Sequence, residues 1–420
     1  MKKLTVVVSV IFVLALALVP FASAEGEGTT LAGGFNGPQG VLVAPDGSVW
    51  VIDSGVGGDT EVAFVDPNTG ESATATYGES ARVVRIDPDG TQTVVATLPS
   101  MVVGTETLGG ARLALVDGTL YATSGGWIDV PSPIPSPAMA AVVKIEEGVV
   151  TPVASGWELE AGQNLDGFIV ESHPYDLTLG PDGVLWVADA GANDLLKVDP
   201  MSGDIQVVAV FAEGVPSPLP NPNRDGAMEA DPVPTGIAFD SSGNAYVSFL
   251  PGFPFLPGSG KVVQVSSDGQ VSDYATGLTM VTDLQTGPDG NLYAVQLGQF
   301  TEQGPVPNSG AIVRVKEGDS SEVVVGELSF PTSIDFNPDG DAYVTINGVG
   351  APGTGEVVKF AALTAEPGTS MVMTPDELPA TGGEGAPNVW AIVGMLALGL
   401  MLVAVGFLLK RRTALVSVRH

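Results

Sequence analysis

The amino-acid sequence predicts an all-β protein, a six-bladed β-propeller of four-stranded blades. A unit of apolar strand, Asp-Gly-type turn and aromatic-bearing strand recurs six times between residues 38 and 360, and a second hairpin follows the first. Asp-Gly between two alternating runs is a strong hairpin signal, because a two-residue turn with positive φ suits Gly and tolerates Asp. Repeats of about 50 to 70 residues built only from strands are typical of a β-propeller.

The sixth unit predicts how the ring closes. The turn glycines of the six units are Gly47, Gly118, Gly183, Gly243, Gly290 and Gly340. The last unit ends one strand early, whereas Thr29–Phe35 resembles the outer strands and precedes the first unit as they precede theirs. We therefore expect Thr29–Phe35 to pair with Glu356–Phe360, which removes two unpaired strand edges. The predicted propeller domain is 25–360.

The beginning of the chain predicts export. Residues 1–24 contain Lys2 and Lys3, an apolar run, and then Ala22-Ser23-Ala24. This order is typical of a secretory signal peptide with cleavage before Glu25. The alternative is an uncleaved membrane anchor, for which the apolar run is short.

The end of the chain predicts anchoring at the cell surface. After a tether at 361–377, the segment 378–420 holds an uncharged run at 389–409 and then a basic cluster. Such a run is long enough for a transmembrane helix, with the basic cluster staying inside. The preceding motif is Leu378, Pro379, Ala380, Thr381 and Gly382. Motif, span and basic cluster together resemble the LPXTG cell-wall sorting signal, and this resemblance implies cleavage by a sortase after the Thr.

A plain C-terminal membrane anchor is the alternative, since eight residues follow the basic cluster where sorting signals usually end. Both interpretations place the propeller on the extracellular face, anchored to the cell wall or the membrane.

Charge and composition exclude several classes of partner and chemistry. The chain has 16 basic and 48 acidic residues, and the segment 25–381 keeps 10 and 47 of them. This acidic balance argues against nucleic acid and anionic membrane surfaces as partners. With no cysteine and only His173 and His420, the chain cannot use thiol catalysis, cysteine-ligated zinc or a pair of imidazoles in the exported domain.

The loop lengths predict which rim carries function. The first and third turns of each unit are tight, whereas the other connections are long. These long connections are 54–81, 124–140, 155–172, 211–234, 250–260 and 297–310. In a four-stranded meander they share one face, and long loops over a rigid scaffold are where binding residues concentrate. The alternative is that they only cap the mouth of the channel.

Candidate ligand-binding residues lie where strands meet this face. The innermost strands begin there with Gln39, Tyr175, Asp176, Thr235, Asp283, Thr332 and Ser333, and the second strands end there with Asp53 and Asp189, the latter followed by Asn193. A ring of such oxygen donors suits Ca²⁺, with Asp53 and Asp189 as tentative ligands. Alternatively, Asp53, Asp189 and Asn193 cap turns through hydrogen bonds to the backbone.

His173 is a candidate base. It precedes Pro174-Tyr175-Asp176 at the start of the third innermost strand. It is the sole side chain of the exported domain whose ordinary pKa allows a base near neutral pH. The alternative is a packed or hydrogen-bonded histidine, since spacing names no Ser or Asp partner for it.

Several segments carry a family resemblance. HPYDLTLGPDG, VADAGANDLLKVDP and LPGFPFLPGSGKVVQV resemble the ScyD/ScyE family of exported, NHL-like six-bladed propellers. The resemblance covers essentially residues 31–360 and implies the fold and export, but no known reaction.

Two classes of function remain. The first is a surface-anchored, monomeric module that binds a small molecule, a glycan or a surface protein through its loop-rich face, supported by the Pro-rich loops at 130–137 and 216–223. The second is a Ca²⁺-dependent lactonase- or esterase-like hydrolase with its site at the channel mouth, where the metal polarises a carbonyl.

Overall fold

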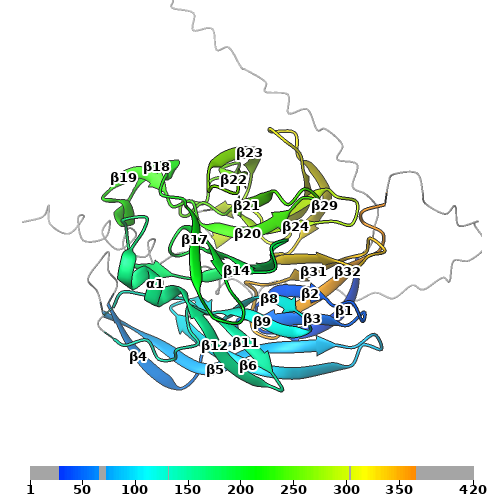
Figure 1. Cartoon of the computed structure of the whole chain (residues 1–420), viewed down its shortest axis with the longest axis horizontal. Helices are drawn as coiled ribbons and strands as arrows, with labels where there is room; N and C mark the ends of the chain where they lie inside the picture. Colours follow the sequence, from blue (N-terminus) through cyan, green and yellow to red (C-terminus); the bar gives the residue numbers. More distant parts are fainter. Residues whose placement is uncertain (1–27, 66–71, 131, 302–303, 366–420) are drawn as a thin grey trace, which may run out of the picture.

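The computed structural model describes residues 28–65, 72–130, 132–301 and 304–365, and these are almost entirely β-strand (Figure 1). Six antiparallel sheets of at least four strands each follow one another along the chain. Sheet 1 consists of β2 (Pro38–Val43), β3 (Val49–Asp53), β5 (Ser72–Ile86) and β6 (Gln92–Val103), extended by β7 (Glu106–Leu108). Sheet 2 consists of β8 (Gly110–Val116), β9 (Thr119–Ser124), β11 (Ala141–Glu146) and β12 (Val149–Ser155).

The next three sheets repeat the same up-and-down order. Sheet 3 consists of β14 (Pro174–Leu179), β15 (Leu185–Asp189), β16 (Asp194–Val198) and β17 (Ile205–Val210). Sheet 4 consists of β20 (Pro234–Phe239), β21 (Ala245–Phe249), β22 (Gly260–Val265) and β23 (Val271–Leu278). Sheet 5 consists of β24 (Val281–Thr286), β25 (Leu292–Gln296), β28 (Gly310–Val315) and β29 (Glu322–Leu328).

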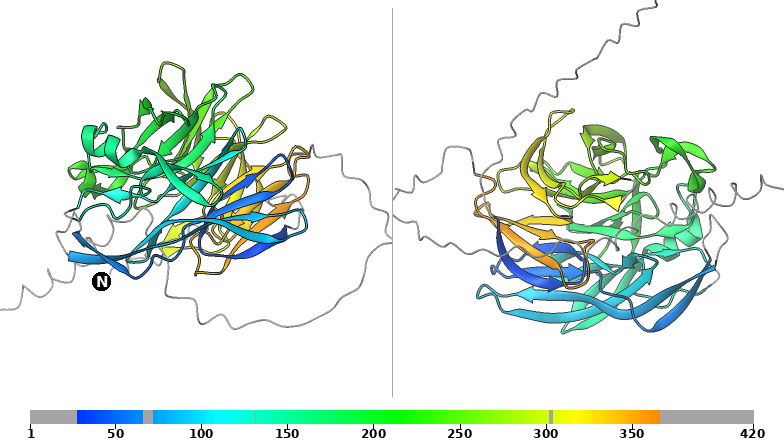
Figure 2. Two further views of the ribbon diagram at one scale, coloured as in Figure 1. Left: turned by 60° about the horizontal axis from the view of Figure 1, so that its bottom comes forward. Right: turned by 180° about the vertical axis from the view of Figure 1, so that it is seen from behind.

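Sheet 6 joins the two ends of the described chain. It consists of β30 (Ser333–Phe336), β31 (Ala342–Ile346), β32 (Gly355–Phe360) and β1 (Thr29–Phe35). β1 pairs antiparallel with β32, and Figure 2 shows the two strands side by side although they lie at opposite ends of the chain. The expected closing pair between Thr29–Phe35 and the last strand is therefore confirmed.

The first strands of the six sheets form a closed ring. β2 lies next to β8, β8 next to β14, β14 next to β20, β20 next to β24, β24 next to β30, and β30 next to β2. Sheets arranged radially around such a ring give a propeller-like fold, with the innermost strands around a central channel.

The hairpin turns are of two kinds rather than the single kind that the sequence predicts. Asp117 and Gly118 both have positive φ, as a two-residue type I′ turn requires. In sheet 1 the turn is one residue longer: Gly47 alone has positive φ, and its N–H donates to the carbonyl of Ala44. The proline of the Pro-Asp-Gly sequences has no N–H to donate, and it occupies a position in this longer turn that needs none.

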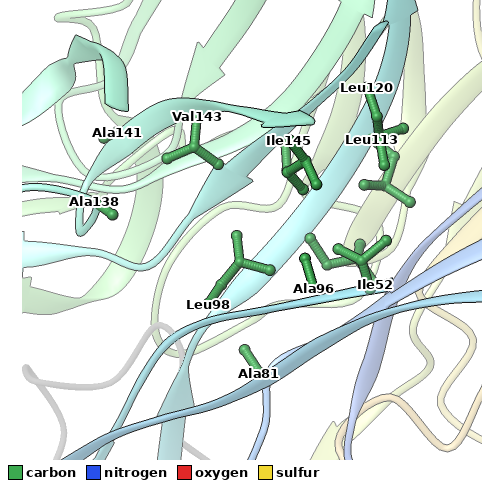
Figure 3. Packing of buried hydrophobic residues seen from close by; sticks show 12 residues of the cluster. Ile52, Ala81, Ala96, Leu98, Leu113, Leu120, Ala138, Ala141, Val143 and Ile145 are labelled. Atoms are coloured by element: carbon green, nitrogen blue, oxygen red, sulfur yellow. The ribbon is translucent and has the colours of Figure 1, made fainter. Parts of the chain in front are cut away.

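The core lies between neighbouring sheets. In the cluster between sheets 1 and 2, Ile52 and Leu98 are fully buried, and Figure 3 shows them beside side chains of the next sheet, such as Leu113 and Ile145. The strands of sheet 2 contribute to two such clusters: Ala122 and Val143 pack toward sheet 1, whereas Tyr121 and Val142 pack toward sheet 3. Sheet 2 is therefore covered on both faces.

The long connections add structure on one rim. β4 (Thr60–Val65) pairs with β5, and β10 (Trp127–Ile128) pairs with β13 (Glu171–Ser172). The helix α1 (Gly156–Gln163), the hairpin of β18 (Val215–Asn221) and β19 (Ala227–Ala230) with η1 (Pro222–Arg224), and the short hairpin of β26 (Phe300–Thr301) and β27 (Gly304–Pro305) complete the described elements. The helix was not expected from the sequence.

The predicted signal peptide (1–24), most of the tether and the predicted sorting signal with its span (389–409) lie outside the described residues. Within the residues that are described, no helix is both long and apolar enough to cross a membrane.

Candidate functional site

Two layers of residues from the innermost strands close the channel beneath the loop-rich rim. The upper layer is formed by the first inward residues of the six strands or their approach. These are Gln39, Ala111, Tyr175, Thr235, Thr282 and Thr332, and all of them line one cavity. The layer below consists of the residues that follow each of them, namely Gly40, Arg112, Asp176, Gly236, Asp283 and Ser333. All six residues of this lower layer are buried.

The cavity above these layers has a volume of about 580 Å³. One side is apolar and consists of Leu250, Phe255, Met280, Leu297 and Phe300, which pack together from the loops of sheets 4 and 5. The opposite side, from sheets 1 to 3, carries polar groups that include Asn36, Ser54, Thr107 and His173. A cavity of this size with one apolar and one polar side suits a small organic ligand. We call it the channel-mouth pocket.

His173 lies on the polar side of this pocket. Its ring meets Tyr175 edge-to-face, with the centroids 5.8 Å apart. A Cβ atom at Gly126 would lie 3.0 Å from the Cγ atom of His173, so this glycine leaves room for the ring. Burial lowers the pKa of His173 to about 4, which keeps the imidazole neutral at pH 7. Among the described residues, the ring nitrogens of His173 have no hydrogen-bond partner, so they are available to a ligand or a water molecule.

Tyr175 and Gln39 form a hydrogen-bonded bridge across the pocket floor. The Tyr175 hydroxyl donates to Oε1 of Gln39 at 3.2 Å, and Nε2 of Gln39 donates to the carbonyl of Gly348 at 2.8 Å. The bridge connects sheet 3 to sheet 1 and to the loop after β31. Both predicted ligand-binding residues therefore reach the pocket, and the Tyr175 oxygen keeps a lone pair that can accept a hydrogen bond.

Arg112 closes the channel below the pocket floor. Its side chain is 4% exposed, and its guanidinium nitrogens donate to backbone carbonyls of sheets 1, 5 and 6. Its Nε atom lies 3.5 Å from Oδ1 of Asp176 and 3.8 Å from Oδ1 of Asp283. The guanidinium carbon stands 4.8 Å from the ring centroid of Tyr175, a cation–π geometry.

The carboxylates of Asp176 and Asp283 also join neighbouring sheets. Oδ2 of Asp176 accepts a hydrogen bond from the backbone N–H of Ile237 in sheet 4. Oδ2 of Asp283 accepts one from the N–H of Ile334 in sheet 6 at 2.9 Å. Burial raises the pKa of Asp176 to about 7, with a further rise from Asp283 and an opposing effect of Arg112. Neither carboxylate lines the pocket, so these two predicted site residues belong to the wall of the channel below it.

Asp53 and Asp189 do not lie on the pocket. Both are completely buried. The carboxylate of Asp53 accepts hydrogen bonds from the N–H groups of Asn36 and Arg82, and it forms an ion pair with the Arg82 guanidinium. Oδ1 of Asp189 accepts the N–H groups of His173, Gly191 and Ala192, and its Oδ2 accepts the hydroxyl of Ser172. These geometries match the turn-capping interpretation.

Asn193 has the same kind of structural role. It has a φ of 53°, its Oδ1 accepts the N–H of Val233, and its Nδ2 donates to Oδ2 of Asp166. It holds the loop between sheets 3 and 4 and does not line the pocket.

The described residues do not fit the Ca²⁺ ion that a lactonase-type propeller implies. The oxygen atoms of Asp53 and Asp189 are occupied by N–H, hydroxyl and guanidinium donors, and the carboxylates of the channel already face Arg112. No three His, Asp or Glu side chains among the described residues are grouped so that they would bind a metal ion. The predicted metal ligands Asp53 and Asp189 come from different sheets and serve different turns.

Arg112 is the residue of this site that sequence reasoning missed. The signal that could have pointed to Arg112 is its position as a charged residue between apolar neighbours in GGARLALV, on a predicted innermost strand. In five of the strands the lower-layer residue stands seven positions before the turn glycine, but in sheet 2 the shorter turn makes the separation six, from Arg112 to Gly118. Counting back from the turn therefore points to the wrong residue in this sheet.

Comparison with known proteins gives a partial match. No family model matches the chain. A gluconolactonase from Zymomonas mobilis is 27% identical over 146 residues, which are 34% of this chain and 35% of that protein, so the match spans about a third of the relative's length. The resemblance to the ScyD/ScyE family stays a prediction.

Two of the solved structures that resemble this chain are distant from it in sequence. A gluconolactonase-like protein has 17% identity and a TM-score of 0.46, covering 81% of this chain and 94% of that one. The calcium-binding protein regucalcin from Agrobacterium tumefaciens has 14% identity and a TM-score of 0.44, covering 80% of this chain and 98% of that one. The sheet order and strand pairing of this chain itself define its fold.

Proposed function

We propose that the protein is a six-bladed propeller that hydrolyses a small lactone or ester in the channel-mouth pocket, with His173 as the general base. The observation that carries this proposal is the neutral imidazole of His173, without a hydrogen-bond partner among the described residues, on the polar side of a cavity of about 580 Å³. The partial similarity to a gluconolactonase supports the choice of lactones as the first substrates.

The pocket suggests how a substrate would be held. The apolar side, with Leu250, Phe255 and Leu297, would take the hydrocarbon part of the substrate and exclude water from it. The carbonyl end would then face His173 and the Tyr175–Gln39 bridge. This placement puts the ester group close to the imidazole of His173.

The chemistry follows from the neutral state of that base. His173 would accept a proton from a water molecule as the water oxygen attacks the carbonyl carbon. The bond from the carbonyl carbon to the ester oxygen then breaks, and the imidazolium returns the proton to the leaving alkoxide. The lowered pKa makes the imidazolium a strong acid toward the leaving alkoxide in the second step, and it makes the imidazole a weaker base toward water in the first step.

The proposal is tested by measuring hydrolysis of a panel of lactones and esters by the full chain and by His173→Gln. We expect the variant to lose activity by about 100-fold or more, because general-base catalysis typically contributes this much. His420→Gln is the matched control, since it removes the other histidine of the chain and lies outside the predicted propeller. Equal activity of His173→Gln and the unchanged protein would contradict the proposal.

Binding without turnover is the second candidate function. It is favoured by the hydroxyl groups of the floor: Thr235 donates to the carbonyl of Val281, and Thr332 donates to that of Pro38. These hydroxyls are already committed as donors, so they do not offer an oxyanion hole. A compound that raises the melting temperature and is recovered chemically unchanged would favour this function over hydrolysis.

The location of the protein belongs to the same proposal. Export and anchoring at the cell wall or membrane are supported by the sequence of 1–24 and 378–420. A surface location would bring the pocket into contact with extracellular small molecules, glycans or surface proteins.

A further inference from the structure

The guanidinium of Arg112 is surrounded by oxygen atoms from four strands and from Thr332, the residue before β30. Nη1 donates to the carbonyls of Gln39 and Ala111, and Nη2 donates to those of Thr282 and Thr332. Nε faces Oδ1 of Asp176 and of Asp283 at 3.5 and 3.8 Å. We propose that this guanidinium is the resident cation of the channel, in the place of a divalent metal ion, and that it fixes the floor of the pocket above it.

Charge balance in the lower layer supports this role. Asp176 and Asp283 are 4% and 5% exposed, and buried carboxylates need a nearby positive charge or hydrogen-bond donors. Arg112 provides the charge, and the backbone N–H groups of Ile237 and Ile334 provide donors. An additional divalent cation would have to displace the guanidinium, because the carboxylate oxygens that face the channel already face Arg112.

No other position of the lower layer can supply a second positive charge, because two of its residues are glycines with no room for a side chain. A Cβ atom at Gly40 would lie 2.5 Å from the carbonyl oxygen of Ala111, and one at Gly236 would lie 2.5 Å from the backbone nitrogen of Leu284. Neither position can therefore carry a side chain without displacing backbone. Of the remaining residues of the layer, Ser333 is neutral, so Arg112 is the single positive charge of this layer.

The hydrogen bonds of Arg112 also explain how it acts on the pocket. Gln39, Thr282 and Thr332 contribute their side chains to the pocket floor, and their backbone carbonyls accept hydrogen bonds from this one guanidinium. Arg112 is therefore a positioning residue. It connects sheets 1, 5 and 6 beneath the ligand without itself lining the cavity.

The proposal makes an unusual prediction for truncation of Arg112. Arg112→Ala would leave two carboxylate oxygens and several carbonyl oxygens facing one vacated volume, and such hard oxygen ligands suit Ca²⁺. The unchanged protein should then be insensitive to Ca²⁺ at this site, whereas Arg112→Ala should be stabilised by it. This inference does not depend on the proposed hydrolase function, because its readout is stability.

The experiment is a thermal melt of the full chain with chelator and with millimolar Ca²⁺, at constant ionic strength. We expect Arg112→Ala to melt at a lower temperature in chelator and to gain at least about 3 °C more from Ca²⁺ than the unchanged protein does. Adding Asp176→Asn and Asp283→Asn to Arg112→Ala should abolish this gain. Arg82→Ala is the matched control: it removes an arginine paired with a single buried aspartate, Asp53, with the same change in net charge, and should show no such gain.

Two results would overturn the proposal. In the first, Ca²⁺ stabilises the unchanged protein, and this stabilisation is lost in Asp176→Asn but kept in Arg82→Ala. Such a result would show that a metal ion displaces the guanidinium. The other is a folded Arg112→Ala variant with no greater Ca²⁺ response than Arg82→Ala. If Arg112→Ala does not fold in chelator, recovery of folded protein on refolding with Ca²⁺ supports the proposal. If it folds in neither condition, the comparison between the unchanged protein and Asp176→Asn decides.

Discussion

Thr30 of β1 is the register partner of Val358 of β32, although these two strands stand at opposite ends of the described chain. The neighbouring side chains strengthen this closure: the hydroxyl of Thr30 donates to Oε2 of Glu356 at 3.0 Å, and Phe35 is 1% exposed against Val357 and its neighbours. One strand pair, between the first and the last strand of the described chain, therefore closes the ring, and the buried Phe35 lies at the end of β1.

Phe35→Ala should destabilise the whole propeller. Truncation of a buried phenylalanine typically costs about 3–5 kcal/mol, because it removes apolar contacts and leaves a cavity. Chemical unfolding monitored by circular dichroism measures this loss, and Thr29→Ala on the exposed end of the same strand is the control, expected to change stability by less than about 0.5 kcal/mol. A loss at Phe35 no larger than at Thr29 would show that closure by β1 does not limit stability.

Asp189 should tolerate loss of its charge but not loss of its oxygens. Its carboxylate accepts four hydrogen bonds, three of them from backbone N–H groups at one oxygen. Asp189→Asn keeps that oxygen as an acceptor and should cost about 1 kcal/mol, whereas Asp189→Ala leaves buried donors unpaired and should cost about 3 kcal/mol or more. Similar losses in the two variants, measured by chemical unfolding, would argue that the charge is what matters there.

Stability should fall as the pH rises through the neutral range, and Glu171 contributes to this fall. Burial raises the pKa of Glu171 from 4.5 to about 8, with further rises from Asp231, Asp189, Asp166 and Glu160. Between about pH 4.5 and 8 the folded protein therefore holds a proton that the unfolded chain releases, so that raising the pH favours unfolding.

Glu171→Gln should flatten this dependence. We expect the difference in melting temperature between pH 5 and pH 8 to shrink by roughly 3 °C. The matched control is Glu322→Gln, whose carboxylate has a lowered rather than a raised pKa because it bonds to Lys316. The same dependence of melting temperature on pH in Glu171→Gln and in the unchanged protein would contradict the raised pKa of Glu171.

Thr381→Ala tests the anchoring that the sequence predicts. If a sortase processes the Leu378–Gly382 motif, the variant should stay in the membrane fraction while the unchanged protein is found with the cell wall. Cell fractionation with immunodetection of the propeller measures this difference. Identical fractionation of both proteins would favour a permanent membrane anchor.

The fold could be predicted to a large extent because its signals are local and repeated. The turn sequences around Gly47 and Gly340 give the hairpin order directly, and the missing last strand leaves one candidate, Thr29–Phe35, to complete sheet 6. The turn type was less predictable, since Asp117-Gly118 and Pro45-Asp46-Gly47 share the Asp-Gly pair and differ in loop length.

The site could be predicted only in part, because the sequence shows which residues stand at strand ends but not where their side chains point. Gln39, Tyr175 and His173 reach the pocket, whereas Asp53 and Asp189 turn toward the backbone of their own loops. The role of Arg112 depends on contacts with residues from Gln39 to Thr332, which no local pattern could reveal.

The channel-mouth pocket holds a neutral imidazole, that of His173, without a hydrogen-bond partner in the part of the chain that the structure describes. An NMR titration of the histidine ring signals tests this most directly. The chain has only two histidines, so His420→Gln leaves the signals of His173 alone. We expect a titration midpoint near pH 4, because burial lowers the pKa of His173 to about 4. A midpoint at the ordinary value of about 6.5 would contradict it, since the ring would then be solvated and His173 would not be a desolvated base of the pocket.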